Sequence, residues 1–124
     1  MDQVSIEIPA SPVYVGVVRL VASGLASRLD FTWDDIEDLK IAVDELCSYL
    51  TGTRGRDGTL EIRFTVLDKG IEITGEARFA PGFTVKTELT DFSRQILETV
   101  ADSATLDRSD GLPRFRLVKT RRGQ

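Results

Sequence analysis

The chain has 124 residues, of which 41% are apolar and 29% charged, and its formal net charge is −4. This length suffices to bury a core without metal or disulfide support, so we expect one domain over residues 1–124. With one cysteine and no histidine, the sequence excludes an internal disulfide, histidine acid–base catalysis and a Cys/His metal site.

The positive charges are scattered, except for a cluster near the end of the chain. Nucleic-acid binding normally needs a concentrated basic face, so we expect no nucleic-acid partner. We interpret the cluster as a solvated strand face and tail. No apolar signal core and no run long enough to span a bilayer is present, so we expect a cytoplasmic protein without a membrane contact. The cluster consists of Arg114, Arg116, Lys119, Arg121 and Arg122.

The first predicted elements are a strand and a helix. Residues 3–8 alternate between apolar and polar and are followed by Pro9, which predicts a half-buried strand. Ser11 and Pro12 are a typical N-cap and first helical residue, so we expect a helix from Pro12 to about Arg28. Its predicted core stripe is Tyr14, Val17, Val18, Val21 and Leu25.

The other side of this helix carries small residues around a single arginine. It is predicted to contain Gly16, Ser23, Ala26 and Ser27 around Arg19. One interpretation is a protein-docking face on which Arg19 binds a carboxylate, with Gly16 and Ser23 allowing close approach. The other is an ordinary solvent face.

A second helix is the clearest pattern in the chain, over residues 34–50. Thr32 and Asp35 predict a capped start, and Gly52 stands where a glycine commonly ends a helix. The predicted core stripe is Ile36, Leu39, Val43, Leu46, Cys47 and Leu50.

Glu45 lies opposite that core stripe. Ile41 and Tyr49 are one turn to either side of it, so its carboxylate is predicted to face a partly apolar hollow where a functional acid could lie. The alternative is a solvated glutamate on an amphipathic helix.

The rest of the chain predicts a hairpin, a third helix and closing strands. The glycine-rich loop at 51–58 lacks the lysine and serine or threonine of a P-loop. We expect helices on one face of a largely antiparallel sheet, a two-layer α+β sandwich. The predicted elements are strands 60–66 and 71–77, a loop or short edge piece at 78–85, a helix over 90–103 with Leu89, Phe92, Ile96 and Val100 at helical spacing, and strands 104–106 and 115–118.

Three segments, residues 14–20, 34–40 and 41–49, closely resemble the bacterial anti-sigma factors that double as serine kinases. These belong to the GHKL superfamily of histidine-kinase-like ATPases. The resemblance implies the Bergerat ATPase fold and a homodimer. It also implies two partners, a sigma factor and an anti-anti-sigma (STAS-type) protein, both gripped through the arginine that aligns with Arg19.

The chain departs from that family at its nucleotide site. The resemblance makes Glu45 the general base, but Tyr49 replaces the asparagine that binds magnesium, and the sequence has no asparagine. Glu76 is the nearest acid to the missing Asp-x-Gly adenine motif. The glycine-rich lid is also absent, and Asp91 at the third helix would repel phosphate.

We therefore predict a degenerate nucleotide pocket at Glu45, Tyr49 and Glu76, with no cofactor and no metal. The leading hypothesis is an anti-sigma factor without effective ATP use. The alternative is a serine kinase that uses ATP and magnesium with Glu45 as base. A third possibility is a subunit that pairs with a competent paralogue.

Overall fold

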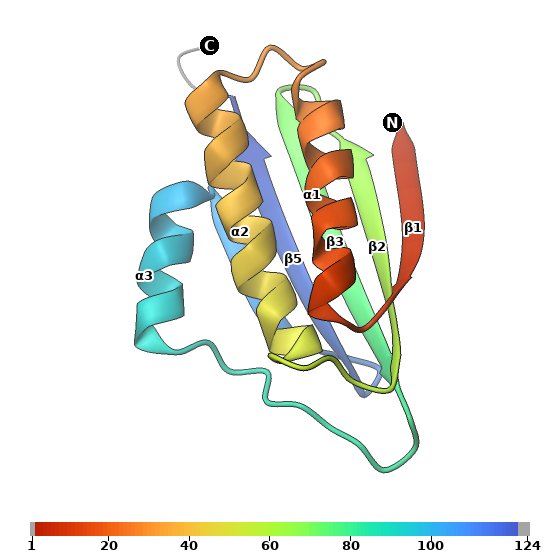
Figure 1. Ribbon diagram of the computed structural model, residues 1–124. Coiled ribbons are helices and arrows are strands. Elements are labelled where there is room, and N and C mark those ends of the chain that lie inside the picture. Colours follow the sequence, from red (N-terminus) through yellow and green to blue (C-terminus); the bar gives the residue numbers. More distant parts are fainter. Residues whose placement is uncertain (1, 122–124) are drawn as a thin grey trace.

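Five strands form one antiparallel sheet in the order β1-β2-β3-β5-β4. In the computed structural model, which describes residues 2–121, three helices cover one face of this sheet (Figure 1). The predicted two-layer α+β sandwich is confirmed. The elements are β1 Gln3–Pro9, α1 Pro12–Ala26, α2 Trp33–Thr51, β2 Gly58–Val66, β3 Gly70–Phe79, α3 Asp91–Val100, β4 Ser103–Ser109 and β5 Leu112–Thr120.

The strands alternate between a core face and an open face. In β2, Leu60, Ile62 and Phe64 are fully buried beneath the helices, whereas Glu61 and Arg63 between them are exposed. A strand with period-two alternation buries one face and leaves the other in water. The sheet therefore contributes one side of the core and presents a polar surface on the other.

Helix α2 forms as the sequence predicts. The Thr32 side chain accepts a hydrogen bond from the Asp35 backbone N–H and the Asp35 carboxylate accepts one from Thr32, a complete capping box. Gly52 ends the helix with φ at 65°. Cys47 on the core stripe is fully buried, and that burial, with Asp44 nearby, raises the pKa of its thiol to about 12. The thiol thus stays protonated and acts as a small apolar residue, as predicted.

The buried face of helix α1 overlaps the predicted core stripe only in part. Its buried residues are Val15, Val18, Ala22 and Ala26, whereas Tyr14 and Val17 of the predicted core stripe are 43% and 41% exposed. The small side chains of Ala22 and Ala26 let α1 lie close against its neighbours, which the larger apolar residues would prevent. The prediction was right for Val18, which is buried, and for Val21 and Leu25, which pack partly buried against the core, but it wrongly placed Ala26 on the far side.

Helix α3 is shorter than predicted. It ends at Val100 rather than near Ser103, because residues 103–109 form β4 and pair with β5. Thr90 caps it, accepting a hydrogen bond from the Ser93 backbone N–H. Phe92, one of the apolar residues at helical spacing, is 72% exposed.

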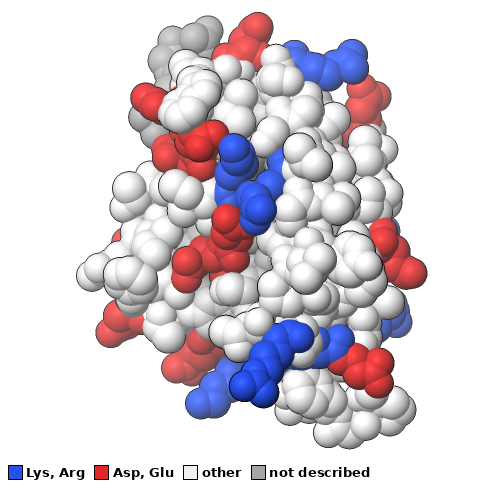
Figure 2. All heavy atoms as spheres, viewed as in Figure 1, with Lys and Arg blue, Asp and Glu red and all other residues white. Residues whose placement is uncertain are grey.

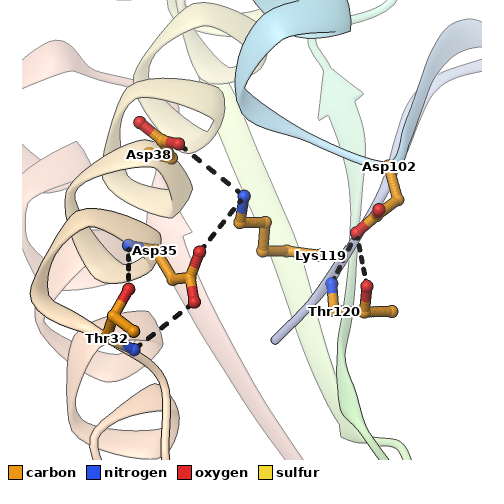
Figure 3. A network of polar contacts seen from close by, with 6 residues as sticks. All are labelled: Thr32, Asp35, Asp38, Asp102, Lys119 and Thr120. Carbon is orange, nitrogen blue, oxygen red and sulfur yellow. Dashed lines mark hydrogen bonds and ion pairs between the residues drawn. The ribbon is translucent and has the colours of Figure 1, made fainter. Parts of the chain in front are cut away.

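The predicted solvation of the terminal basic cluster is wrong for Lys119. Its side chain is only 6% exposed, and its Nζ lies 3.8 Å from Asp35 Oδ1 and 3.7 Å from Asp38 Oδ2 on α2 (Figure 3). Lys119 points inward because Ile71, its partner in the sheet, is also on the core face. Arg122 of the same cluster lies outside the described residues.

Candidate functional site

Glu45 lies where α2 meets the start of α3. Its Oε2 accepts a hydrogen bond from Ser93 Oγ at 2.6 Å. Ser93 belongs to the first turn of α3 and is only 4% exposed. The carboxylate of Glu45 is therefore partly buried and directed at the N-terminal end of α3.

Tyr49 lies at the same contact between α2 and α3, one turn further along α2. Its hydroxyl donates to Ser93 Oγ at 2.7 Å and accepts from the Thr90 backbone N–H at 3.0 Å. Burial raises the pKa of the Tyr49 phenol, but its hydrogen bonds with Ser93 and Thr90 outweigh this effect and lower the pKa below its ordinary value of 10.0. Tyr49, Ser93 and Thr90 thus form one hydrogen-bonded group with Glu45, here called the α3 junction.

Replacing Tyr49 by phenylalanine tests the α3 junction. We expect the free energy of unfolding near pH 7 to fall by about 1–2 kcal/mol, because the Thr90 N–H loses its acceptor and Ser93 Oγ loses the hydrogen bond that Tyr49 donates. Because the folded pKa of Tyr49 lies below the unfolded one, wild-type protein gains stability as the pH rises towards about 10. The loss in Tyr49→Phe should therefore grow between neutral and alkaline pH in urea unfolding. Tyr14→Phe, at an exposed position, is the control, and a loss no larger than in this control would contradict the prediction.

Glu76 does not join Glu45 and Tyr49. It pairs across the sheet with Arg114 of β5, and its carboxylate contacts Arg78 at 3.1 Å. Its β3 neighbours Gly75 and Ala77 are buried on the core face, so Glu76 faces the open side of the sheet. Of the three predicted pocket residues, the structure brings only two together.

Arg19 and Gly16 lie together on α1, with Ser23 one turn further along. The Arg19 Nη1 lies 2.5 Å from Asp44 Oδ1 on α2, and its side chain is 38% exposed. Its Nη2 lies 3.4 Å from where a Cβ on Gly16 would be, so the absent side chain leaves room for the guanidinium. This arginine therefore bridges two helices at the surface.

Beside Arg19, α1 exposes an apolar stripe that the sequence analysis missed. Val13, Val17 and Leu20 are 82%, 41% and 72% exposed, at helical spacing on one face. The sequence contained a signal for this surface, since α1 carries two apolar stripes and a half-buried helix buries only one of them. Exposed apolar residues grouped on one face indicate a surface that binds another protein.

The described residues contain no metal-binding group and no membrane-spanning helix. Among residues 2–121, no three Asp, Glu or Cys side chains gather closely enough to hold a metal ion. In the same part of the chain, no helix is long and apolar enough to cross a membrane.

The order of elements and the three helices on one sheet face are consistent with a histidine-kinase-like ATPase fold. No protein-family model matches the chain. Relatives named "Serine-protein kinase RsbW" are 46% identical over 76 residues in Bacillus velezensis, 44% over 78 in Bacillus pumilus and 43% over 75 in Bacillus subtilis. Each match covers 58–59% of this chain. The predicted resemblance is thereby confirmed: the matched part is homologous to these kinases.

The matches also cover only part of the relatives. The chain spans about half the length of those it matches, 48%, 48% and 47% for these three.

Proposed function

We propose that this chain is an anti-sigma factor that sequesters an alternative RNA polymerase sigma factor and is antagonised by an anti-anti-sigma protein, without effective ATP use. The α3 junction is the observation that supports this most directly. Tyr49, Ser93 and Thr90 bond to one another, and Ser93 bonds to Glu45, at the place where the resembled family holds magnesium and phosphate.

The residues at the α3 junction do not fit a magnesium-bound triphosphate. A neutral phenol is a poor magnesium ligand, and the Tyr49 oxygen already accepts the Thr90 N–H. The helix N-terminus that would bind phosphate has its Ser93 N–H capped by Thr90, and exposed Asp91 adds negative charge there. Glu45, the family's base, is engaged by the Ser93 hydroxyl.

The surface of α1 supports the partner-binding part of the proposal. Arg19 offers a half-exposed guanidinium, and a partner carboxylate could replace its contact with Asp44. Val13, Val17 and Leu20 beside it would lose water contact on association, which contributes roughly 25 cal/mol per Å² of apolar surface. A charged anchor next to exposed apolar residues suits a specific protein interface.

The alternative is a serine kinase that phosphorylates the anti-anti-sigma protein with Glu45 as base. It is favoured by the name of the relatives, "Serine-protein kinase RsbW". It requires ATP and magnesium to enter the α3 junction and displace the contacts of Tyr49 and Ser93.

Calorimetric titration with ATP and ADP, with and without magnesium, separates the two functions. We expect no heat at protein concentrations able to detect a dissociation constant of about 1 mM. A competent RsbW relative serves as the positive control. Micromolar, magnesium-dependent binding, with phosphate transfer that is lost in Glu45→Ala, would instead establish the kinase.

Partner capture is tested in the same preparation with the alternative sigma factors of the source organism. We expect one of them to bind, and Arg19→Glu to weaken it by about 100-fold or more, because a like charge would then face the partner carboxylate. Arg28→Glu, an exposed reversal just beyond the same helix, is the matched control. Unchanged capture by Arg19→Glu, with its fold intact by circular dichroism, would remove the docking role.

A further inference from the structure

A cleft of about 850 Å³ opens beside the C-terminal end of α2. It is lined by the last turn of α2, the glycine-rich loop and the segment 80–86 that follows β3. Basic side chains gather at the lower edge of the molecule in Figure 2, where Figure 1 places this end of α2. The cleft shares Tyr49 with the α3 junction, but Glu45, Thr90 and Ser93 do not line it.

The charge of the cleft is opposite to that of the protein. Arg54, Arg56 and Lys86 line it against a single acid, Asp57, although the whole chain carries a net charge of −4. Within residues 2–121, no ion pair joins any of these three cations to a carboxylate, whereas Arg19, Lys40 and Arg116 each have one. The cleft therefore holds positive charge that is available to a ligand.

An aromatic side chain, Phe83, gives the cleft an apolar lining. Phe83 is 47% exposed, and its ring lies edge-on against Phe79, with the centroids 5.2 Å apart. The guanidinium of Arg56 lies over the Phe83 ring, 5.5 Å from its centroid. This cation–π contact fixes one positive charge next to an exposed apolar surface.

The geometry favours spread carboxylates over a compact phosphate group. The cleft adjoins the C-terminal end of α2, where the helix dipole is negative and disfavours a concentrated anion. Phosphate sites usually present converging backbone N–H groups at a helix N-terminus. At the start of α3, the Thr90 N–H is already bonded to Tyr49. Separated cations on long side chains suit the spaced carboxylates of an extended peptide.

We propose that this cleft binds an acidic segment of a partner protein, with an apolar side chain of that segment resting on Phe83. Carboxylates of the segment contact Arg54, Arg56 and Lys86. This site is separate from the α1 surface, so its occupation does not depend on the proposed sigma-factor contact. It gives the chain a second protein-binding surface, in which Tyr49 is the one predicted site residue among those that line the cleft.

Fluorescence anisotropy with a labelled short peptide of aspartate, glutamate and two leucines tests the proposal. We expect a dissociation constant on the order of 10–100 μM at low salt, rising with ionic strength. A peptide with lysines in place of the acids should not bind. Tighter direct binding of inorganic triphosphate than of the peptide would overturn the proposal, as would no binding of the acidic peptide.

Charge reversals locate the binding surface. Arg54→Glu and Lys86→Glu alter exposed side chains and should each weaken the peptide by about tenfold, whereas the exposed controls Arg28→Glu and Lys69→Glu, outside the cleft, should change it by less than about twofold. Phe83→Ala should weaken the leucine-containing peptide more than one with alanines in those positions. Equal weakening by cleft and control reversals would show diffuse attraction and overturn the assignment.

Discussion

Replacing Lys119 by methionine lowers the free energy of unfolding by about 3–5 kcal/mol, the largest effect we expect from a single substitution. Methionine keeps the length and apolar stem of the side chain but removes its charge. The Asp35 carboxylate has no exposed surface and Asp38 is 22% exposed, so both lose a cation in a site that water does not reach well. Urea unfolding at neutral pH measures the loss.

Two variants separate this effect from a general loss of a lysine. Lys40→Met removes the cation of an ion pair with Glu37 in which both side chains are 36% exposed. It should lower the free energy of unfolding by less than about 1 kcal/mol. Adding Asp35→Asn to Lys119→Met removes the buried negative charge, and it should recover part of the stability because the amide keeps its place in the capping box. A cost for Lys119→Met equal to that for Lys40→Met would contradict the prediction.

Gly75→Ala should lower the free energy of unfolding by about 1–3 kcal/mol through overpacking. A Cβ at this position would lie 2.3 Å from Cε2 and 2.7 Å from Cζ of Phe115, its neighbour on β5. Phe115 is fully buried, so its ring cannot move aside without displacing other core residues. Gly75 is therefore needed in β3 because only a residue without a Cβ leaves room for the Phe115 ring.

A double-mutant cycle tests this explanation. Phe115→Leu creates a cavity by itself. The double variant Gly75→Ala/Phe115→Leu should lose less stability than the two single variants added together, because the added methyl group occupies part of that cavity. Gly24→Ala is the matched control: nothing lies within 4 Å of its Cβ position in α1. It should stabilise the protein by about 0.5–1 kcal/mol. Simple additivity at Gly75 and Phe115 would refute the steric account.

The sequence by itself determined the fold class, the course of α2 and the resemblance to a known family. Helix α2 was predictable because its caps and its single apolar stripe are local features, within a few residues of each other. The position of Glu45 opposite the core followed from the same periodicity. The hairpin of β2 and β3 followed from two alternating runs joined by a short turn.

Only the tertiary structure decided which face of α1 is buried, because α1 carries two apolar stripes and close packing selects the one with small residues. It also decided the burial of Lys119, whose partners lie on a helix far away in the sequence. The α3 junction depends on the same kind of contact: Ser93 meets Glu45 and Tyr49 only after α3 has packed against α2. No local pattern encodes these contacts, because each forms only when segments distant in the chain come together around the shared core.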